Sequence, residues 1–537
     1  WRLFAHLPRR ERLVFACLSA ALGAATSVFW MTVGSSFLDP LLVIPMLAGL
    51  LLLVDDGRSP GRRAFLAGAL FGIAAALKYS NAIFAVAALP LAAAMPGAYG
   101  MGRLRPALAY MAGGALAVAL FAGPWLALMA REFGNPVFPL MNGWFQSPHA
   151  LPVNLVARRF IPEDLGAALA FPFRMLASDR AVYSEVFAPD IRFAALLAAA
   201  LAVPVLRVRR SASAHAALRG IDWRVLAFLA AGLVLWLATS ANARYGLVLL
   251  LLGGVCLARL AERVLPARAC RIGLAVLLVV QLTMLVMSSP SRWMPEPWTR
   301  QWLAYAVPPR ALQVPSLYLT VEVLSMSALT PLVHPASSFV NFRGQHSLPT
   351  DSLRLGALLE RHRGRVRTLG RGLELVDGKP RPEALQSYDA TLLRIGYRVN
   401  ADDCFTIPWE RDDGDRLSRA VNWLARLEPS PEELSVVSCA LLPVSRDAED
   451  IAAEQAMSSL FDRMEKACPE VFRGQTAVTE RLGSGWSRNY AGLDARLEVH
   501  AGTVILNRYR SAIYLHLGAL SDWKGAQPPS IPGCTGG

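Results

Sequence analysis

Long apolar runs fill the first part of the chain and stop near residue 290. They lie at roughly 13–34, 40–54, 64–77, 81–95, 107–130, 191–206, 225–240, 245–260 and 272–289. A helix that crosses a bilayer needs about 20 largely apolar residues, so the pattern predicts about nine membrane spans, several of them short. Residues 290–537 instead mix polar and apolar positions like an ordinary globular sequence. The chain therefore divides into a membrane domain, 1–290, and a second domain, 291–537.

The run from 64 to 95 contains a polar interruption at Lys78–Asn81. Broken helices at membrane depth are tolerated where protein surrounds the break. We therefore expect two short helices that meet at this interruption inside the bundle.

Arginines cluster in alternate loops of this pattern, at Arg2, Arg9, Arg10, Arg12, Arg58, Arg62, Arg63, Arg103, Arg105, Arg207, Arg209, Arg210, Arg263, Arg268 and Arg271. Basic residues mark the cytoplasmic ends of spans. The loop at 131–190 and the domain from 291 onward then lie on the other side, which in a bacterium is the periplasm. This predicts a multi-pass protein of the inner (cell) membrane with a periplasmic C-terminal domain.

Composition agrees with a membrane protein. The chain is 54% hydrophobic with a mean hydropathy of +0.37, and it has 18% charged residues where soluble domains have about 25%. The net charge of +14 comes largely from the loop arginines. Basic and aromatic residues do not interleave as they do in single-strand binders, so nucleic acid is not an expected partner.

The second domain alternates strand-like and helical segments. Strands are expected at 316–322, 338–342, 365–369 and 434–442, helices at 325–332, 351–363, 382–397 and 449–466, and further β segments between 477 and 517. Such alternation predicts a small α/β layer with a mostly parallel sheet. The domain has no phosphate-binding loop, no metal-spaced Cys/His set and no nucleophile elbow. It would cap the membrane part, bind an acceptor or dock partner proteins.

Four of the seven cysteines lie in this second domain, at Cys404, Cys439, Cys468 and Cys534. An even number in an oxidising compartment favours up to two disulfides. The spacing does not fix the pairing; we expect Cys404 with Cys439 and Cys468 with Cys534.

Three charged positions could carry chemistry in the first domain. Asp39 falls between two apolar runs, Lys78 is the first lysine of a chain whose 54 basic residues are mostly arginine, and Arg244 stands at the non-cytoplasmic end of a run. Intramembrane charges usually face a cavity or a counter-ion, and cations there suit phosphate. Each has a plainer explanation: Asp39 as a helix cap before Pro40, Lys78 reaching the interface, and Arg244 as an isolated loop residue.

The loop at 131–190 opens with a rigid segment that contains Gly134, Pro136 and Pro139. Loops of this length often bind ligands. Its candidate substrate-binding residues are Arg131, Glu132, Asn135 and His149.

Four short segments together give a family resemblance: Ser36–Asp39, Gly72–Tyr79, Phe133–Pro139 and Ala243–Tyr245. Their order and their common side of the expected bundle resemble the bacterial GT-C glycosyltransferases, which include protein O-mannosyltransferases and the aminoarabinose transferase of lipid A. The resemblance covers most of 13–260.

The resemblance implies an enzyme of the hexosyl- or pentosyltransferase type in the bilayer. It would transfer a sugar, with inversion, from a polyprenyl-phosphate or polyprenyl-diphosphate carrier to an acceptor lipid, polysaccharide or protein. Lys78 and Tyr79, with Arg244 and Tyr245, would bind the donor phosphate, and Asp39 would match the second acidic position of the family. No cofactor is assigned; Mg²⁺ or Mn²⁺ is optional in the superfamily, and Asp39 would be its ligand.

The family's first carboxylate, the general base, has no counterpart in the sequence. Because position 1 is Trp rather than Met, we expect two N-terminal spans, and this base with them, to be missing. Two other functions stay open: a transporter or flippase for lipid-linked sugars, and a non-catalytic membrane subunit of an envelope complex. The transferase hypothesis requires Asp39, Lys78 and Arg244 to converge on one site.

Overall fold

The computed structural model describes residues 2–33, 35, 37–55, 57, 59–95, 104–155, 158–179, 181–209, 220–287, 304–322, 325–342, 353–410, 415–425, 434–472, 477–482, 485–493, 495–508 and 513–525. The chain folds into two compact units. The first comprises residues 1–128 and 158–294, and the second comprises 129–157 and 295–537. The segment that carries Arg131, Glu132, Asn135 and His149 therefore belongs to the second unit.

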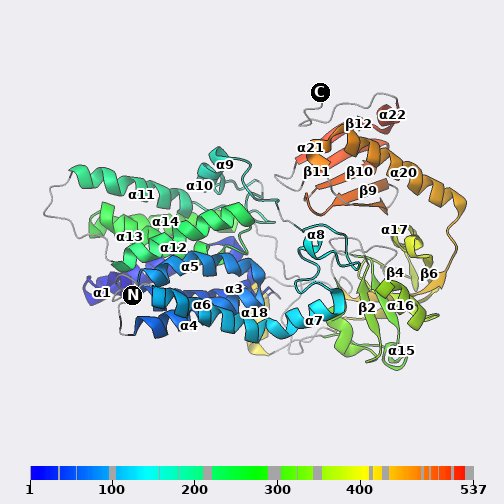
Figure 1. Cartoon of the computed structure of the whole chain (residues 1–537), viewed down its shortest axis with the longest axis horizontal. Coiled ribbons are helices and arrows are strands. Elements are labelled where there is room, and N and C mark those ends of the chain that lie inside the picture. Colours follow the sequence, from blue (N-terminus) through cyan, green and yellow to red (C-terminus); the bar gives the residue numbers. More distant parts are fainter. Residues whose placement is uncertain are drawn as a thin grey trace. The chain divides into compact units, whose positions relative to one another are not determined.

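The first unit is helical (Figure 1). Its helices are α1 (Arg9–Ala24), α2 (Ser27–Thr32), α3 (Asp39–Val54), α4 (Pro60–Leu77), α5 (Ala82–Ala93), α6 (Leu104–Phe121), α9 (Leu165–Leu169), α10 (Phe171–Arg174), α11 (Arg192–Arg209), α12 (Gly220–Thr239), α13 (Leu247–Val264) and α14 (Ala267–Met287), with short 3₁₀ turns η1 (Arg2–Phe4) and η2 (Tyr79–Asn81). Helix α7 (Gly123–Phe133) leads from this unit into the second.

The expected interruption at Lys78–Asn81 is confirmed. Helix α4 ends at Leu77, Lys78 is extended with φ −153° and ψ 107°, and η2 then leads into α5. The carbonyl of Ala74 accepts both the backbone N–H of Lys78 at 3.2 Å and the side-chain amide of the buried Asn81 at 3.2 Å. These two bonds fix the turn on both sides of η2, whereas the buried hydroxyl of Ser80 has no hydrogen-bond partner among the described residues.

The prediction of about nine membrane spans is wrong. Among the described residues only two helices, α6 and α14, are long and apolar enough to cross a membrane. Three of the other runs fold into helices shorter than 18 residues: 13–34 divides into α1 and α2, 40–54 forms the 16-residue α3, and 81–95 forms the 12-residue α5. Helix α13 is long enough but carries Arg259, Glu262 and Arg263. The predicted fold class, a polytopic GT-C-like bundle followed by an α/β domain, is therefore corrected.

The predicted multi-pass inner-membrane localisation is wrong for the same reason, because two such helices are too few for it. The assignment of the second unit to the periplasm depended on counting nine alternating spans. Without those spans the sequence no longer supports this assignment. In the most apolar stretches of α6 and α14 only 22% and 17% of the residues are buried.

A buried ion pair joins several helices of the first unit. Arg192, at the start of α11, is fully buried and donates through Nε to Asp190 Oδ1 at 2.9 Å. Its Nη1 donates to the carbonyls of Gly23 at 2.8 Å and Leu250 at 3.2 Å. A buried arginine is tolerated only when its donors are satisfied, so this side chain holds the C-terminal end of α1 against α13.

The second unit contains a five-stranded mixed sheet in the order β2-β1-β3-β7-β6. Its strands are β1 (Leu317–Thr320), β2 (Ser338–Asn341), β3 (Val366–Thr368), β6 (Tyr397–Ile407) and β7 (Val436–Pro443). Strand β1 pairs in parallel with β2 and β3, whereas β7 is antiparallel to both β3 and β6. The same unit contains the helices α8 (Asn142–Phe145), α15 (Pro309–Gln313), α16 (Leu353–Arg361), α17 (Pro382–Leu392) and α18 (Arg416–Ala425). It also contains the 3₁₀ turns η5 (Ser327–Leu332) and η6 (Leu393–Ile395) and a small hairpin of β4 (Leu375–Val376) and β5 (Lys379–Pro380).

An antiparallel sheet follows in the same unit, in the order β12-β11-β10-β9-β8. Its strands are β8 (Val478–Leu482), β9 (Gly485–Tyr490), β10 (Ala495–His500), β11 (Thr503–Arg508) and β12 (Ile513–Ala519). The helices beside it are α20 (Ala448–Ala467), α21 (Pro469–Phe472) and α22 (Leu520–Lys524). Buried residues of α20, including Phe461 and Met464, share one core with Leu497 and Leu506 of the sheet.

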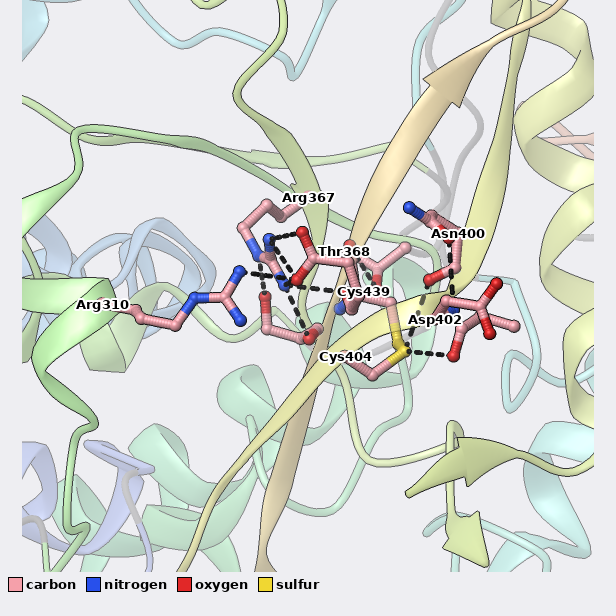
Figure 2. A network of polar contacts seen from close by, with 10 residues as sticks. Arg310, Arg367, Thr368, Asn400, Asp402, Cys404 and Cys439 are labelled. Carbon is pink, nitrogen blue, oxygen red and sulfur yellow. Dashed lines mark hydrogen bonds and ion pairs between the residues drawn. A yellow bond between two sulfur atoms is a disulfide. The ribbon is translucent and has the colours of Figure 1, made fainter. Parts of the chain in front are cut away.

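The expected disulfide between Cys404 and Cys439 is present. The two residues stand directly opposite each other on β6 and β7, with Cα atoms 4.0 Å apart. Figure 2 shows this bond beside a polar network in which Arg310 bonds Asp403 at 2.6 Å and Arg367 donates to Ser438 Oγ at 3.0 Å. Cys468 is also disulfide-bonded; Cys534, its expected partner, lies outside the described residues.

Candidate functional site

Asp39 and Lys78 form an ion pair in the first unit. The ammonium Nζ of Lys78 lies 2.5 Å from Asp39 Oδ1. Asp39 is the first residue of α3 rather than its N-cap, and its carboxylate is 2% exposed, whereas the Lys78 side chain is 23% exposed. A carboxylate at a helix N-terminus is favoured by the helix dipole, and the break after α4 brings the lysine to it.

Arg244 pairs with Glu185 beside this first pair. Arg244 Nη2 donates to Glu185 Oε1 at 3.0 Å, and the side-chain amide of Asn242 donates to the same oxygen at 2.9 Å. The turn between α12 and α13 is fixed because Asn242 Oδ1 accepts the backbone N–H of Arg244 at 3.1 Å. The N–H of Ala243 donates to the carbonyl of Tyr183 at 2.6 Å, which holds the segment containing Glu185 against this turn.

Aromatic rings join the two pairs. Lys78 Nζ lies 4.5 Å from the centre of the Tyr245 ring, and the guanidinium of Arg244 lies 5.7 Å from the same ring. Arg244 also lies 4.4 Å from the Phe37 ring. Both cations are therefore held by cation–π contacts as well as by carboxylates. We call the group Phe37, Asp39, Lys78, Glu185, Asn242, Arg244 and Tyr245 the charged cluster.

Each carboxylate of the charged cluster has one oxygen to spare. Asp39 Oδ2 and Glu185 Oε2 are buried and have no hydrogen-bond partner among the described residues. An unsatisfied buried acceptor costs about 1–3 kcal/mol, so each oxygen would gain by accepting a hydrogen bond from a ligand. The cluster thus combines two cations with two carboxylates, each of which has one oxygen that accepts no hydrogen bond within the described part of the chain.

Burial and neighbouring charges move the pKa values in the cluster. Burial lowers the pKa of Lys78 below that of an ordinary lysine; Asp39 opposes this change and Arg244 adds to it. Burial alone would raise the pKa of Glu185, but the charge of Arg244 and the hydrogen bond from Asn242 outweigh it and lower the pKa. Burial also raises the pKa of Tyr245. At neutral pH Glu185 is therefore ionised and the Tyr245 hydroxyl keeps its proton.

The structure brings together Asp39, Lys78, Arg244 and Tyr245, as the transferase hypothesis requires. Tyr79 differs, because the residue is 38% exposed and its side chain makes no hydrogen bond or cation–π contact with the cluster in the described part of the chain. What these residues bind is not tested by their positions, so the donor-phosphate role stays a prediction.

The predicted outer-loop residues make contacts within the second unit. Glu132 pairs with Arg354 of α16 at 2.6 Å, and Arg131 pairs with Glu132 at 3.0 Å. Asn135 is fully buried and its amide donates to the carbonyl of Leu140 at 2.9 Å, so its contacts are structural. His149 packs edge-on against the Phe133 ring, with ring centres 5.7 Å apart.

No group of three or more His, Cys, Asp and Glu side chains that could hold a metal ion occurs in the described residues. Asp39 and Glu185 are the two carboxylates of the charged cluster, and each is already paired with a cation. We therefore assign no metal to the cluster.

Sequence reasoning did not rank Glu185 or single out Asn242 as a site residue. Glu185 was one of several charged residues in the loop at 131–190, and nothing in its spacing connects it to a turn almost 60 positions later. Asn242 gave a weak signal, because an asparagine two residues before an arginine is typical of a turn whose side chain bonds the backbone.

Comparison of the chain with protein-family models, with curated proteins and with solved structures finds no match in any of the three. The resemblance to GT-C glycosyltransferases therefore stays a prediction, supported by the residues that carry it.

Proposed function

We propose that the charged cluster binds the phosphate of a polyprenyl-phosphate-linked or polyprenyl-diphosphate-linked sugar and that the chain transfers this sugar to an acceptor. One observation carries the proposal: Lys78 and Arg244 approach the same Tyr245 ring, and each is balanced by a carboxylate with a spare oxygen. Two cations suit a phosphate, and carboxylates beside them suit an acceptor hydroxyl.

In this reaction the acceptor oxygen attacks the anomeric carbon while the bond between that carbon and the phosphate oxygen breaks. Negative charge grows on the leaving phosphate, so Lys78 and Arg244 stabilise the transition state more than the bound donor. Glu185 receives the acceptor proton, because its side chain is 27% exposed whereas that of Asp39 is 2% exposed. Asp39 positions Lys78.

The exposed apolar sides of α6 and α14 support a lipid-linked donor. Leu116 and Leu120 of α6 are 50% and 64% exposed, and Val279 and Val286 of α14 are 63% and 73% exposed. Large exposed apolar surfaces usually meet a membrane or a partner. The proposal includes contact with a bilayer but assigns neither the side on which the reaction occurs nor the acceptor.

The test uses purified protein in lipid nanodiscs. Farnesyl phosphate is the binding probe, and farnesyl-phosphate-linked glucose, galactose, mannose and arabinose are offered with water or a mixture of sugar acceptors. A charge-assisted hydrogen bond contributes about 1.5–3 kcal/mol, so Lys78→Met and Arg244→Gln should each weaken farnesyl phosphate binding about 10- to 100-fold. Arg174→Gln is the matched control, because Arg174 is exposed in the same unit.

Glu185→Gln separates binding from turnover. It should keep farnesyl phosphate binding within a few-fold of the wild type, or improve it, while release of farnesyl phosphate from the sugar-linked donors falls at least 100-fold. Binding without any release from the wild-type protein would favour a lipid-linked-sugar transporter or a non-catalytic subunit. If Lys78→Met and Arg244→Gln both bind farnesyl phosphate as the wild type does, the charged cluster is not the phosphate-binding site.

A further inference from the structure

A groove of about 360 Å³ lies between α17 and strand β8 in the second unit. One stripe of α17 forms most of its wall, at positions spaced as on a single helix face: Pro382, Leu385, Gln386, Asp389, Ala390 and, in η6, Leu393. Arg481 of β8 also lines it. Ligand pockets range over about 300–1,000 Å³, so this groove suits a small ligand.

One ion pair connects the two walls of the groove. Arg394 of η6 and Glu480 of β8 form an ion pair at 3.7 Å, with side chains only 7% and 10% exposed. Because this pair ties the end of α17 to β8, the two walls keep a fixed separation there.

Two residues of opposite charge, Asp389 and Arg481, line the groove, and each has polar atoms that can form further hydrogen bonds. Asp389 Oδ1 accepts the backbone N–H of Val399 at 2.7 Å, and Oδ2 has no such partner among the described residues. Arg481 uses Nη1 for Asp450 at 3.2 Å and stacks over the Trp486 ring at 6.0 Å, and its other donors are not engaged within the described part of the chain. An acceptor-only group and a donor-only group therefore both line the groove.

From these features we infer that the groove binds a neutral saccharide. Sugar hydroxyls donate to Asp389 and accept from Arg481, and the Gln386 amide can do both. The C–H face of a sugar ring packs on Leu385 and Leu393. A ligand with a net charge would meet a like charge at one of the two residues, whereas an uncharged polyol meets none.

The saccharide is assigned as the acceptor of the transfer reaction, a step that rests on the proposed function. A transferase that takes its sugar from a lipid carrier needs a second site for the molecule that receives it. The charged cluster accounts for the donor phosphate, and the groove is separate from it along the chain.

The test measures binding of fluorescently labelled neutral trisaccharides of glucose, galactose, mannose and N-acetylglucosamine to the full chain. Asp389→Asn keeps an oxygen for Val399 and removes the charge, so it should weaken binding about tenfold. Gln386→Trp fills the groove from an exposed position and should abolish binding. Asp402→Asn is the matched control, because Asp402 is an exposed carboxylate of the same unit that pairs with Lys379 at 2.8 Å.

The saccharide proposal is overturned if none of the trisaccharides binds, if Gln386→Trp binds as the wild type does, or if trialanine competes as well as the sugars. The acceptor assignment has its own test: the bound trisaccharide should speed release of farnesyl phosphate from the wild type but not from Gln386→Trp. Unchanged farnesyl phosphate binding by Gln386→Trp shows that the donor site is intact, so the two proposals can fail separately.

Discussion

At the scale of single residues, the protonation of Lys78 should make the net charge of the charged cluster depend on pH. Burial lowers the pKa of this lysine, and the facing groups are Asp39, Glu185, Arg244 and Tyr245. The pKa of Glu185 is lowered, so it stays ionised, and that of Tyr245 is raised, so its hydroxyl ionises only at a higher pH than that of an ordinary tyrosine. Lys78 is therefore the group of the cluster that loses its charge first as the pH rises.

This gives a prediction for phosphate binding. Farnesyl phosphate should bind the wild type progressively more weakly as the pH rises from 7 to 10, with a midpoint below the ordinary lysine pKa of about 10.4. Lys78→Arg should move this loss to higher pH, because arginine stays protonated. Titration of binding at fixed ionic strength checks it, and identical pH profiles for the two proteins would contradict it.

The lowered pKa of Lys78 affects folding stability in the opposite direction: as the pH rises, phosphate binding weakens but the folded state becomes more stable. A lysine whose folded pKa lies below its unfolded value disfavours the folded state when it is charged. Its stabilising contribution is thus full above the unfolded pKa and is lost as the pH falls through the folded pKa. The pair with Asp39 offsets part of this cost. The cluster therefore keeps a charged lysine at neutral pH at some expense of stability, as functional sites often do.

Part of the charged cluster could be foreseen from single residues. Asp39, Lys78 and Arg244 stood out because a charge in an apolar run is costly and needs a reason. Glu185 could not be foreseen, since its pairing with Arg244 depends on how a long loop folds back on a distant turn. The functional meaning of the residues was assigned from a resemblance, which three-dimensional contacts alone do not test.

At the scale of elements, the packing of α4 against α6 depends on glycine. A Cβ atom at Gly113 would overlap the backbone carbonyl of Phe65, and one at Gly68 would overlap that of Tyr110. The neighbouring Gly114 has more room, because the nearest atom to its Cβ would be the carbonyl oxygen of Gly68 at 3.4 Å. Small residues let helices approach this closely.

We therefore predict that Gly113→Ala destabilises the first unit whereas Gly114→Ala does not. Both substitutions bring the same gain in helix propensity, about 0.5–1 kcal/mol, so the difference between them reports the close contact. Gly113→Ala should lower the unfolding temperature by several degrees, and Gly114→Ala should leave it unchanged or raise it slightly. Thermal unfolding of matched preparations measures both, and equal shifts would argue against the α4–α6 contact.

The elements of the second unit were easier to predict than those of the first. Strands β1, β2, β3 and β7 and helices α16 and α20 lie within a few residues of their expected positions, because alternating short segments carry clear periodicity. The sheet is mixed rather than mostly parallel, since β7 inserts between β3 and β6 with reversed direction. In the first unit, apolar content revealed helices but overestimated how many are long and charge-free enough to span a bilayer.

At the scale of the whole molecule, each unit has its own hydrophobic core. The core of the first unit includes Phe71, Phe228 and Trp236. The second unit has separate cores, one around Leu319 and Cys439 in the mixed sheet and another around Phe461 in the antiparallel sheet. Units with separate cores can in principle unfold separately.

This organisation predicts that a change in one unit leaves the stability of the other unaltered. The disulfide Cys404–Cys439 closes a loop over a sequence separation of 35, and such a cross-link contributes about 2–4 kcal/mol. Replacing both cysteines with serine should lower the unfolding temperature of the second unit by about 5–10 °C. Gly113→Ala should act on the first unit alone.

Hydrogen exchange read by mass spectrometry along a temperature series can assign each transition, because its peptides come from known segments. The Cys404→Ser/Cys439→Ser variant should lose protection early in β6, β7 and α17, which share the core around Cys439, while α4 and α13 exchange as in the wild type. Cys17→Ser is the control, since Cys17 is an exposed free thiol. Early loss of protection in α4 and α13 as well would mean that the two units unfold as one, and stability effects in the second unit could then not be separated from those at the charged cluster.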